Sequence, residues 1–300
     1  MKLSILICTK DRKTQFLECL RSIAEQTRLP EEIIVIEEAS AKSFFSQKFI
    51  EDYFHNKVSC KYFQIKSLNI AVSRNLAVKA ATYEILLFVD DDVTLSKDYC
   101  QKLINIYEKE NGLVIAGGRI KSKKEGYWAK FWEKLFTSIS PKLNSDTKVL
   151  FWPNLNMAIL KSFIYKKKIF YDERFTTLED IDFCLRVRRN KGIVKYYPIL
   201  KARHYYRNNI LVFLVSFWKY YRRLPLLIKK HPTEVKIIFP LKRFSPKFLK
   251  QKIFYPFFII SQLIDYDKDL IKRLGLTKKY YFAGFLYGAI FYFSSVRSRK

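Results

Sequence analysis

Three consecutive carboxylates, Asp90, Asp91 and Asp92, directly follow the apolar run Ile85 to Val89. Such a run is typical of a parallel strand that is buried on both faces, and in open α/β sheets ligands bind where strands end. Packed carboxylates raise one another's pKa, so the cluster is stable as anions mainly when a Mg²⁺- or Mn²⁺-like ion neutralises it. The pattern therefore predicts a buried strand with a cation site at its end. The alternative is a solvated acidic turn that caps the next helix.

Strand-like and helix-like segments alternate through the first two thirds of the chain. Apolar runs predict strands and apolar residues at helical spacing predict helices. The predicted strands are Leu3 to Cys8, Glu31 to Ile36, Cys60 to Ile65, 85–89, Leu113 to Ile120 and Met157 to Leu160, and the predicted helices are Phe16 to Ile23, Phe44 to Phe54, Ile70 to Ala81, Tyr99 to Tyr107 and Leu178 to Asn190. This order predicts an α/β fold with helices flanking a mostly parallel, Rossmann-like sheet. Thr177 and Asp180 predict a capping box at the start of the last helix.

Basic residues are concentrated near the end of the chain. Lys and Arg number 56 against 28 for Asp and Glu, and residues 201–300 hold 22 basic and four acidic residues. This shift in composition near His204 predicts two domains, a catalytic one over 1–204 and a helical, basic, aromatic region over 205–300. The basic region suits an anionic membrane surface or a nucleic acid.

Two apolar stretches in this region could meet lipid, Ile253 to Ile264 and Tyr280 to Val296. The second has about 17 residues and no charge, at the lower limit for a bilayer core of about 30 Å, and basic residues follow it. It fits an interfacial helix on the cytoplasmic face at least as well as a span, so we expect peripheral or monotopic attachment. A helix packed on the soluble domain is the alternative.

Five scattered cysteines favour a reducing compartment.

Five motifs in sequence order carry a resemblance to a known family. They are Ser4 to Arg12, Glu32 to Glu38, Asn69 to Asn75, Asp90 to Asp92, and Glu179 with Asp180. Together they resemble the family 2 glycosyltransferases over about residues 1–205. The resemblance implies a GT-A fold, a nucleotide-diphosphate sugar donor, a Mn²⁺ or Mg²⁺ ion, and transfer with inversion at the anomeric carbon. We expect the enzyme to act in the synthesis of a cell-surface polysaccharide or glycolipid, with a glycan or lipid-linked acceptor.

Donor-side candidates follow the first strands. Carboxylates at the end of the second strand could accept hydrogen bonds from a base or ribose, and the turn after the first strand could line the same crevice. Arg74 could neutralise phosphate or orient the acidic triplet, although an exposed helical arginine is equally compatible with the sequence. The donor-binding candidates are Thr9, Asp11, Arg12, Glu37, Glu38, Arg74, Asp90 and Asp91.

The resemblance also implies the metal ligands, the base and the acceptor side. Asp92 corresponds to the direct metal ligand and Asp90 to a ribose or metal-water contact, and His204 is either a further ligand or a structural histidine. Asp180 corresponds to the base that takes the acceptor proton. Asp180 could instead only cap its helix, with Glu179 or Asp182 as the base. Trp152, Asn154 and Glu179 are the acceptor-binding candidates, although Trp152 is equally compatible with a core position.

The charge also admits functions of another class. A nucleic-acid-binding protein would explain the net charge of +28, but it leaves the acidic cluster without a purpose, and the sequence has no recognisable nucleic-acid module. A metal-dependent nucleotidyltransferase would share the sheet and the metal, yet its Gly-rich phosphate loop is missing. We therefore expect a glycosyltransferase with no nucleic-acid partner.

Overall fold

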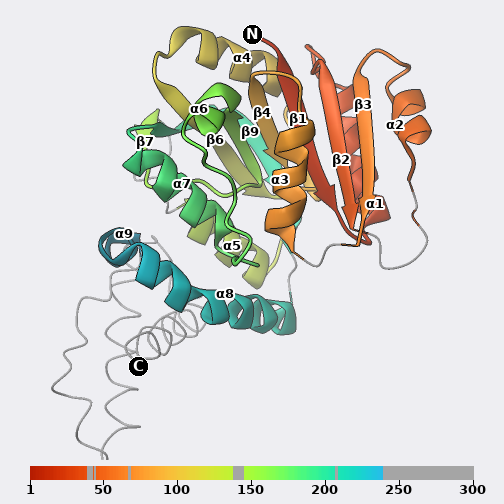
Figure 1. Ribbon diagram of the computed structural model, residues 1–300. Coiled ribbons are helices and arrows are strands. Elements are labelled where there is room, and N and C mark those ends of the chain that lie inside the picture. The colour runs from red at the N-terminus through yellow and green to blue at the C-terminus, as the bar shows by residue number, and fades with distance from the viewer. Residues whose placement is uncertain (39–42, 44, 67–68, 138–144, 207–208, 239–300) are drawn as a thin grey trace, which may run out of the picture. The chain divides into compact units, whose positions relative to one another are not determined.

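The computed structural model describes residues 1–238, apart from 39–42, 44, 67–68, 138–144 and 207–208 (Figure 1). The chain forms two compact units, one of residues 1–123 and 139–205 and one of residues 124–138 and 206–300. The two stretches predicted to meet lipid lie outside the described residues. Within the described ranges, no helix combines the length and the apolar character needed to cross a bilayer.

The first unit contains a single mixed sheet with the order β3-β2-β1-β4-β8-β6-β9-β5, and β7 also pairs with β9. Its strands are β1 (Leu3–Thr9), β2 (Glu32–Glu38), β3 (Ser59–Ile65), β4 (Ile85–Val89), β5 (Val93–Leu95), β6 (Leu113–Ser122), β7 (Thr147–Lys148), β8 (Asn156–Leu160) and β9 (Ile193–His204). The first four neighbours, β3 to β4, are parallel, as predicted. Beyond β4 only β6 and β9 pair in parallel, so the second half of the sheet is mostly antiparallel.

Helices flank this sheet (Figure 1). They are α1 (Lys13–Ala24), α2 (Gln47–Tyr53), α3 (Ile70–Ala80), α4 (Tyr99–Lys109), α6 (Lys161–Lys166) and α7 (Glu179–Arg189). α3 packs on β1 and β2, α1 on β5, and α4 and α7 on β9. The apolar positions that predicted these helices form their buried faces, for example Phe16, Leu20 and Ile23 of α1. The second unit contains α5 (Tyr127–Thr137), α8 (Ile210–Lys230) and α9 (Pro232–Ile238).

The strand β9 was missed by the sequence analysis. Its last residues alternate between exposed and buried, from Ile199 to Ala202, and its pairing with β6 shifts register between Gly118 and Arg119. Pro198 interrupts the run, and a proline inside a strand-like run argues against a strand. Its pairing with β5 nevertheless brings His204 opposite Val93, directly after the acidic triplet.

The predicted capping box of α7 is wrong. The N-cap is Leu178, not Thr177, and it makes no side-chain capping hydrogen bond. Leu178 has a left-handed backbone with φ of 65°, a conformation that is uncommon for a residue other than glycine. Such backbone strain concentrates at functional sites, and Leu178 immediately precedes the two acidic residues of the Glu179-Asp180 motif.

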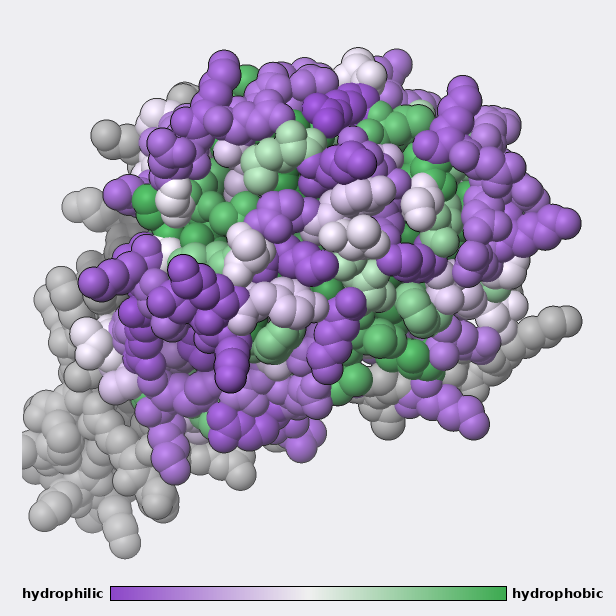
Figure 2. Space-filling model, turned by 45° about the horizontal axis from the view of Figure 1, so that its top comes forward, coloured by the Kyte–Doolittle hydropathy of each residue, from purple (hydrophilic) through white to green (hydrophobic). Residues whose placement is uncertain are grey.

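The surface seen in Figure 2 is mostly hydrophilic, as expected for a chain in which 28% of the residues are charged. Hydrophilic side chains make up most of the face seen in Figure 2, and small apolar areas lie between them. The apolar residues of the central strands are buried instead: all five residues of β4 and all seven of β2 are inaccessible or nearly so. The sheet is therefore a rigid support for the polar residues at the ends of its strands.

Candidate active site

The turn after β4 carries the acidic triplet. β1 and β4 pair in parallel with Leu6 opposite Phe88, so the end of β1 lies beside this turn. The backbone N–H of Val93 donates to the carbonyl of Asp90 at 3.0 Å and closes the turn. Asp91 and Asp92 are buried, whereas the Asp90 side chain is about one third exposed. Buried carboxylates require partners, and β1 supplies several of them.

Asp91 is held by the residues that follow β1. The Thr9 hydroxyl donates to Asp91 Oδ2 at 2.9 Å, and Arg12 Nη1 lies 2.8 Å from both Asp91 Oδ1 and Asp92 Oδ2. Burial raises the pKa of Asp91 to about 6, against the opposing effect of Arg12. Both oxygens of Asp91 are thus occupied by protein donors. Asp11 is exposed, with a left-handed φ of 52°.

Asp92 faces His204 from the end of β9. The distance from Asp92 Oδ1 to His204 Nε2 is 3.0 Å, and the Tyr205 N–H donates to the Asp92 carbonyl at 3.1 Å. Burial alone would raise the pKa of Asp92, but His204 and then Arg12 lower it below its ordinary value. The Asp92 carboxylate is therefore stabilised as an anion, which is the form that binds a cation.

The Asp92–His204 pair fits a divalent metal. Two adjacent ligands of an octahedral ion at about 2.1 Å lie about 3.0 Å apart, so the separation of 3.0 Å, which is that of an ion pair, is also compatible with two ligands of one ion. A carboxylate oxygen with an imidazole nitrogen is a suitable donor set for Mn²⁺. No group of three or more His, Cys, Asp or Glu side chains converges to hold a metal in the part of the chain that the structure describes. Asp92 and His204 are therefore the candidate ligands at this turn.

Arg74 connects the acidic triplet to α7. It lies on α3, whose N-cap residue Asn69 accepts a hydrogen bond from the Ala71 N–H at 3.0 Å. The Arg74 side chain is buried, donates to the Glu179 carboxylate, and places Nη2 3.4 Å from Asp90 Oδ1. The interpretation of Arg74 as an exposed helical arginine is therefore wrong. Glu179 serves as its partner, so the carboxylate of Glu179 is engaged within the protein.

The first turn of α7 presents three carboxylates in three environments. Glu179 pairs with Arg74, and Asp182 is fully buried with its Oδ2 2.8 Å from Arg186 Nε. Asp180 is partly exposed, accepts a hydrogen bond from the Ile181 N–H at 2.8 Å, and takes part in no ion pair found in the described ranges. Burial, followed by the charge of Glu179, raises the pKa of Asp180 to about 7. Asp180 is thus the partly exposed carboxylate of this turn, whereas Glu179 and Asp182 are buried in ion pairs.

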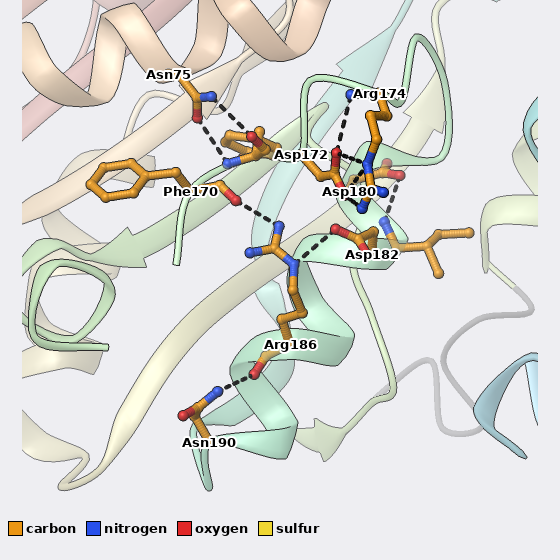
Figure 3. A network of polar contacts seen from close by, with 10 residues as sticks. Asn75, Phe170, Asp172, Arg174, Asp180, Asp182, Arg186 and Asn190 are labelled. Carbon is orange, nitrogen blue, oxygen red and sulfur yellow. Dashed lines mark hydrogen bonds and ion pairs between the residues drawn. The ribbon is translucent and has the colours of Figure 1, made fainter. Parts of the chain in front are cut away.

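The loop before α7 is clamped from two sides (Figure 3). Arg186 Nη2 donates to the Phe170 carbonyl at 2.6 Å. Asn75 of α3 donates to the Tyr171 carbonyl at 2.9 Å and accepts from the Tyr171 N–H at 2.8 Å. Arg174 and Asp172 form a further ion pair within the loop. These contacts were not predicted from the sequence, because Asn75 and Tyr171 are separated by 96 positions.

Glu37 and Glu38 end β2 but already have protein donors. Glu37 accepts hydrogen bonds from the hydroxyls of Ser43 and Tyr62. Glu38 accepts a hydrogen bond of 2.6 Å from Ser73, which immediately precedes Arg74. Both glutamates are buried. Direct recognition of a base or ribose would therefore compete with these internal hydrogen bonds.

Trp152 and Asn154 are each only 2% exposed. Trp152 Nε1 donates to Asn156 Oδ1 at 3.0 Å, and its ring lies 4.9 Å from that of Tyr196. Asn154 Oδ1 accepts a hydrogen bond of 2.7 Å from the Tyr171 hydroxyl. The predicted stacking of Trp152 on an acceptor sugar does not fit this burial. Asn154 instead contacts the loop before α7 through Tyr171, and Trp152 packs in the core against Tyr196.

The structure therefore joins most of the predicted residues into one network. Arg74 contacts Asp90 and Glu179, and Arg12 bridges the other two residues of the triplet. The members of this network are Thr9, Arg12, Arg74, Asp90, Asp91, Asp92, Glu179 and His204, with Asp180 next to Glu179. Electrostatically, Arg74 and Asp90 both act on Asp180. Arg74 thus lies between the acidic triplet and the first turn of α7.

We expect the ion pair between Asp182 and Arg186 to stabilise the folded protein. Asp182→Ala leaves the Arg186 guanidinium without its carboxylate in a mostly buried position, which typically costs about 3 kcal/mol of unfolding free energy. We expect a clear decrease in the midpoint of urea unfolding. Glu18→Ala, which removes the exposed carboxylate beside Lys123, serves as the control and should change stability by less than about 1 kcal/mol. Equal midpoints for the two variants would contradict this role.

Comparison with known proteins identifies similar sequences. The family model described as "Glycosyl transferase family 2" matches residues 4–174. A "Glucosyl-dolichyl phosphate glucuronosyltransferase" of Haloferax volcanii is 25% identical over 122 residues, which cover 40% of this chain and 38% of that protein. A "Poly(ribitol-phosphate) beta-glucosyltransferase" of Bacillus spizizenii is 27% identical over 191 residues, which cover 62% of this chain and 29% of that protein. The chain thus matches well under half the length of either relative.

A solved structure shares the fold. The structure of S. aureus TarS residues 1–349 in complex with UDP superimposes with a TM-score of 0.55 at 17% identity, covering 100% of this chain and 92% of that one. At this identity the likeness concerns the fold alone. It confirms the GT-A arrangement predicted from the sequence motifs.

Proposed function

Because the chain belongs to glycosyl transferase family 2, we propose that it moves a sugar from a nucleotide-diphosphate donor to a hydroxyl group, with inversion at the anomeric carbon. One observation carries the proposal: Arg74 connects Asp90, in the cation-binding turn, to Glu179, which adjoins Asp180. An inverting transfer needs a donor site and a base on opposite sides of the reacting carbon. A shared arginine is a direct way to hold the two sites in a constant relation.

The donor diphosphate would bind beside the acidic turn. Asp92 and His204 would hold a Mn²⁺ or Mg²⁺ ion, which when bound acts as a Lewis acid toward the leaving diphosphate. Arg12 is about one third exposed and supplies positive charge at this turn, so it can also meet a phosphate oxygen. Arg74 keeps Asp90 oriented. Thr9 holds Asp91, which in turn fixes Arg12. The UDP named in the TarS structure supports a uridine nucleotide as the first to test.

Asp180 would act as the base. As the acceptor oxygen forms its bond to the anomeric carbon and the bond to the diphosphate breaks, the hydroxyl proton passes to an Asp180 oxygen. A base is most effective when its pKa is close to the working pH, and the pKa of Asp180 is about 7. Asn75 and Arg186 hold the preceding loop and so position α7. Precise placement of the base contributes as much as its basicity.

The proposed acceptor class is supported by the names of two relatives. The two relatives are named for a dolichyl-phosphate-linked sugar and for a polymer of ribitol phosphate. We propose a glycan or lipid-linked acceptor in cell-surface polysaccharide or glycolipid synthesis. Residues 1–204 would form the catalytic domain, and the basic region 205–300 would hold the enzyme on the cytoplasmic face of an anionic membrane. Each Lys or Arg near such a surface contributes roughly 1 kcal/mol.

A donor panel tests the proposed reaction. Detergent-purified full chain is incubated with UDP-, GDP- and dTDP-sugars in Mn²⁺, Mg²⁺ or chelator, and slow donor hydrolysis is measured. We expect one donor to be hydrolysed, because water can replace the acceptor hydroxyl. Hydrolysis should require a divalent metal, because the metal stabilises the leaving diphosphate. Binding of no donor under any metal, together with tight and salt-sensitive binding of nucleic acid, would overturn the proposal.

A further inference from the structure

Four basic side chains lie in direct cross-strand register on β6 and β9. Arg119 is opposite Lys201, and Lys121 is opposite Arg203. Residues two apart on a strand project from the same face, so all four project from one face of the sheet. The intervening Ile120 and the residue opposite it are buried, which confirms that the other face points inward.

Nothing within the described part of the chain neutralises these four charges. Three of them are exposed and Arg119 is half-buried, and no ion pair or further electrostatic interaction involves any of the four with an acidic residue among the described residues. Neighbouring lysines differ, because Lys195 on β9 pairs with Glu110 and Lys123 after β6 pairs with Glu18. Like charges directly opposite one another destabilise a sheet. An external anion would offset that cost.

An apolar side chain projects from the same face. Ile199 is 47% exposed, two positions before Lys201. The register shift between Gly118 and Arg119 leaves residues 198–200 of β9 without partners on β6, and Ile199 lies in the middle of them. An exposed isoleucine bordered by unpaired cations combines an apolar group that can enter an interface with charges that attract anionic headgroups.

We propose that this basic face, formed by Arg119, Lys121, Ile199, Lys201 and Arg203, docks on an anionic membrane surface. The four cations would meet anionic headgroups, and burial of Ile199 requires an apolar interior, which a soluble polyanion does not provide. The inference rests on the proposed membrane location and adds a contact made by the catalytic unit itself. His204 follows Arg203 on the strand and therefore points to the opposite face, toward Asp92. Docking would leave the Asp92–His204 pair uncovered.

Vesicle binding of the full chain tests the proposal. Lys121→Gln/Lys201→Gln is compared with the parent on vesicles of phosphatidylcholine with and without 30% phosphatidylglycerol. Each basic residue near an anionic bilayer strengthens binding about fivefold, so the double variant is expected to bind about 25-fold more weakly. Lys166→Gln/Lys167→Gln, which removes two exposed lysines of the α6 region, is the matched control and is expected to bind within about twofold of the parent.

A local probe separates docking from general charge. A solvatochromic dye on Ile199→Cys is expected to shift to the blue on anionic vesicles, whereas the same dye on Ser162→Cys, an exposed site on α6, is not. Equal losses in both double variants, or no shift at position 199, would overturn the proposal. So would unchanged vesicle binding combined with weakened binding of soluble poly(glycerol phosphate).

The same samples keep this inference distinct from the proposed function. Donor hydrolysis is measured without vesicles for the parent and both double variants. Normal hydrolysis in all three with equal vesicle binding would reject the basic face and retain the glycosyltransferase. Absence of hydrolysis in every sample, the parent included, would reject the proposed function whatever the vesicles show.

Discussion

We expect the Asp180→Asn variant to transfer sugar about 10²- to 10⁴-fold more slowly than the parent, because an amide cannot take the acceptor proton. The change is nearly isosteric, so the Ile181 N–H keeps an oxygen acceptor and α7 is expected to retain its start. The rate is measured as product formed at saturating donor. The loss should fall on kcat, since donor binding depends on other residues.

The pH dependence of the parent tests the same assignment. Transfer should rise with pH while Asp180 loses its proton and level off above about pH 7, because its pKa is about 7. The Asp180→Asn variant should lack this rise. Glu179→Gln is the matched comparison: the neighbouring charge raises the pKa of Asp180, so removing it should move the rise to lower pH. A rise that persists unchanged in Asp180→Asn would assign the base to another group.

As pH rises, the contribution of Asp180 to the unfolding free energy should decrease while the transfer rate increases. The pKa of Asp180 is raised from 3.8 to about 7 in the folded protein, so between these values the folded state binds more protons than the unfolded state. The unfolding free energy attributable to this group therefore decreases as pH rises through that window. Asn carries no charge and removes the penalty. Asp180→Asn should thus have a Tm equal to or above that of the parent at pH 8, and a lower Tm would indicate a structural role instead.

The second large effect is expected for Asp92→Asn. Asp92 and His204 are the two side chains that fit a metal at the acidic turn, and loss of one of two protein ligands should weaken Mn²⁺ binding by at least about 100-fold. Calorimetric titration of Mn²⁺ in the presence of UDP measures this directly. Metal-dependent donor hydrolysis should disappear in parallel.

Two controls keep the Asp92 result specific. Asp98→Asn removes a carboxylate that pairs with Lys102 at a partly exposed position, and it should leave Mn²⁺ affinity unchanged. Circular dichroism should show the Asp92 variant to be folded. Parent-like Mn²⁺ affinity in folded Asp92→Asn protein would show that the metal does not bind at this turn. The role of Asp92 would then be structural, through its ion pair with Arg12.

Several site residues could be placed from the sequence because the signal is local. The apolar run 85–89 predicts the strand within its observed bounds, and a parallel pairing with β1 puts the end of that strand beside Thr9. The hydrogen bond from Thr9 to Asp91 is the direct consequence. Ligand sites of open α/β sheets lie where strands end, so the sequence could place Thr9 and Asp91 at strand ends, whereas their direct contact depends on the β1–β4 pairing across 82 positions.

Other residues could not be assigned from the sequence. The sequence alone does not distinguish the three carboxylates at the start of α7. In the structure Arg74 pairs with Glu179 and Arg186 pairs with Asp182, which leaves Asp180 outside both ion pairs. Trp152 and Asn154 read as acceptor contacts, but their burial removes them from the surface. The basic face was hidden for the same reason, since Lys121 and Arg203 are 82 positions apart in the chain and meet only through the β6–β9 register.

The sequence by itself determined the α/β class, the strand that ends in the acidic triplet, and the family. Apolar periodicity and short motifs act over a few residues, and burial of an apolar run is favourable in nearly any arrangement that covers it. Only the tertiary structure decided the mixed order of the sheet, the partner of each carboxylate and the pKa of Asp180. Those properties depend on distances between residues remote in sequence, such as the 105 positions that separate Arg74 from Glu179, and on how completely water is excluded between them.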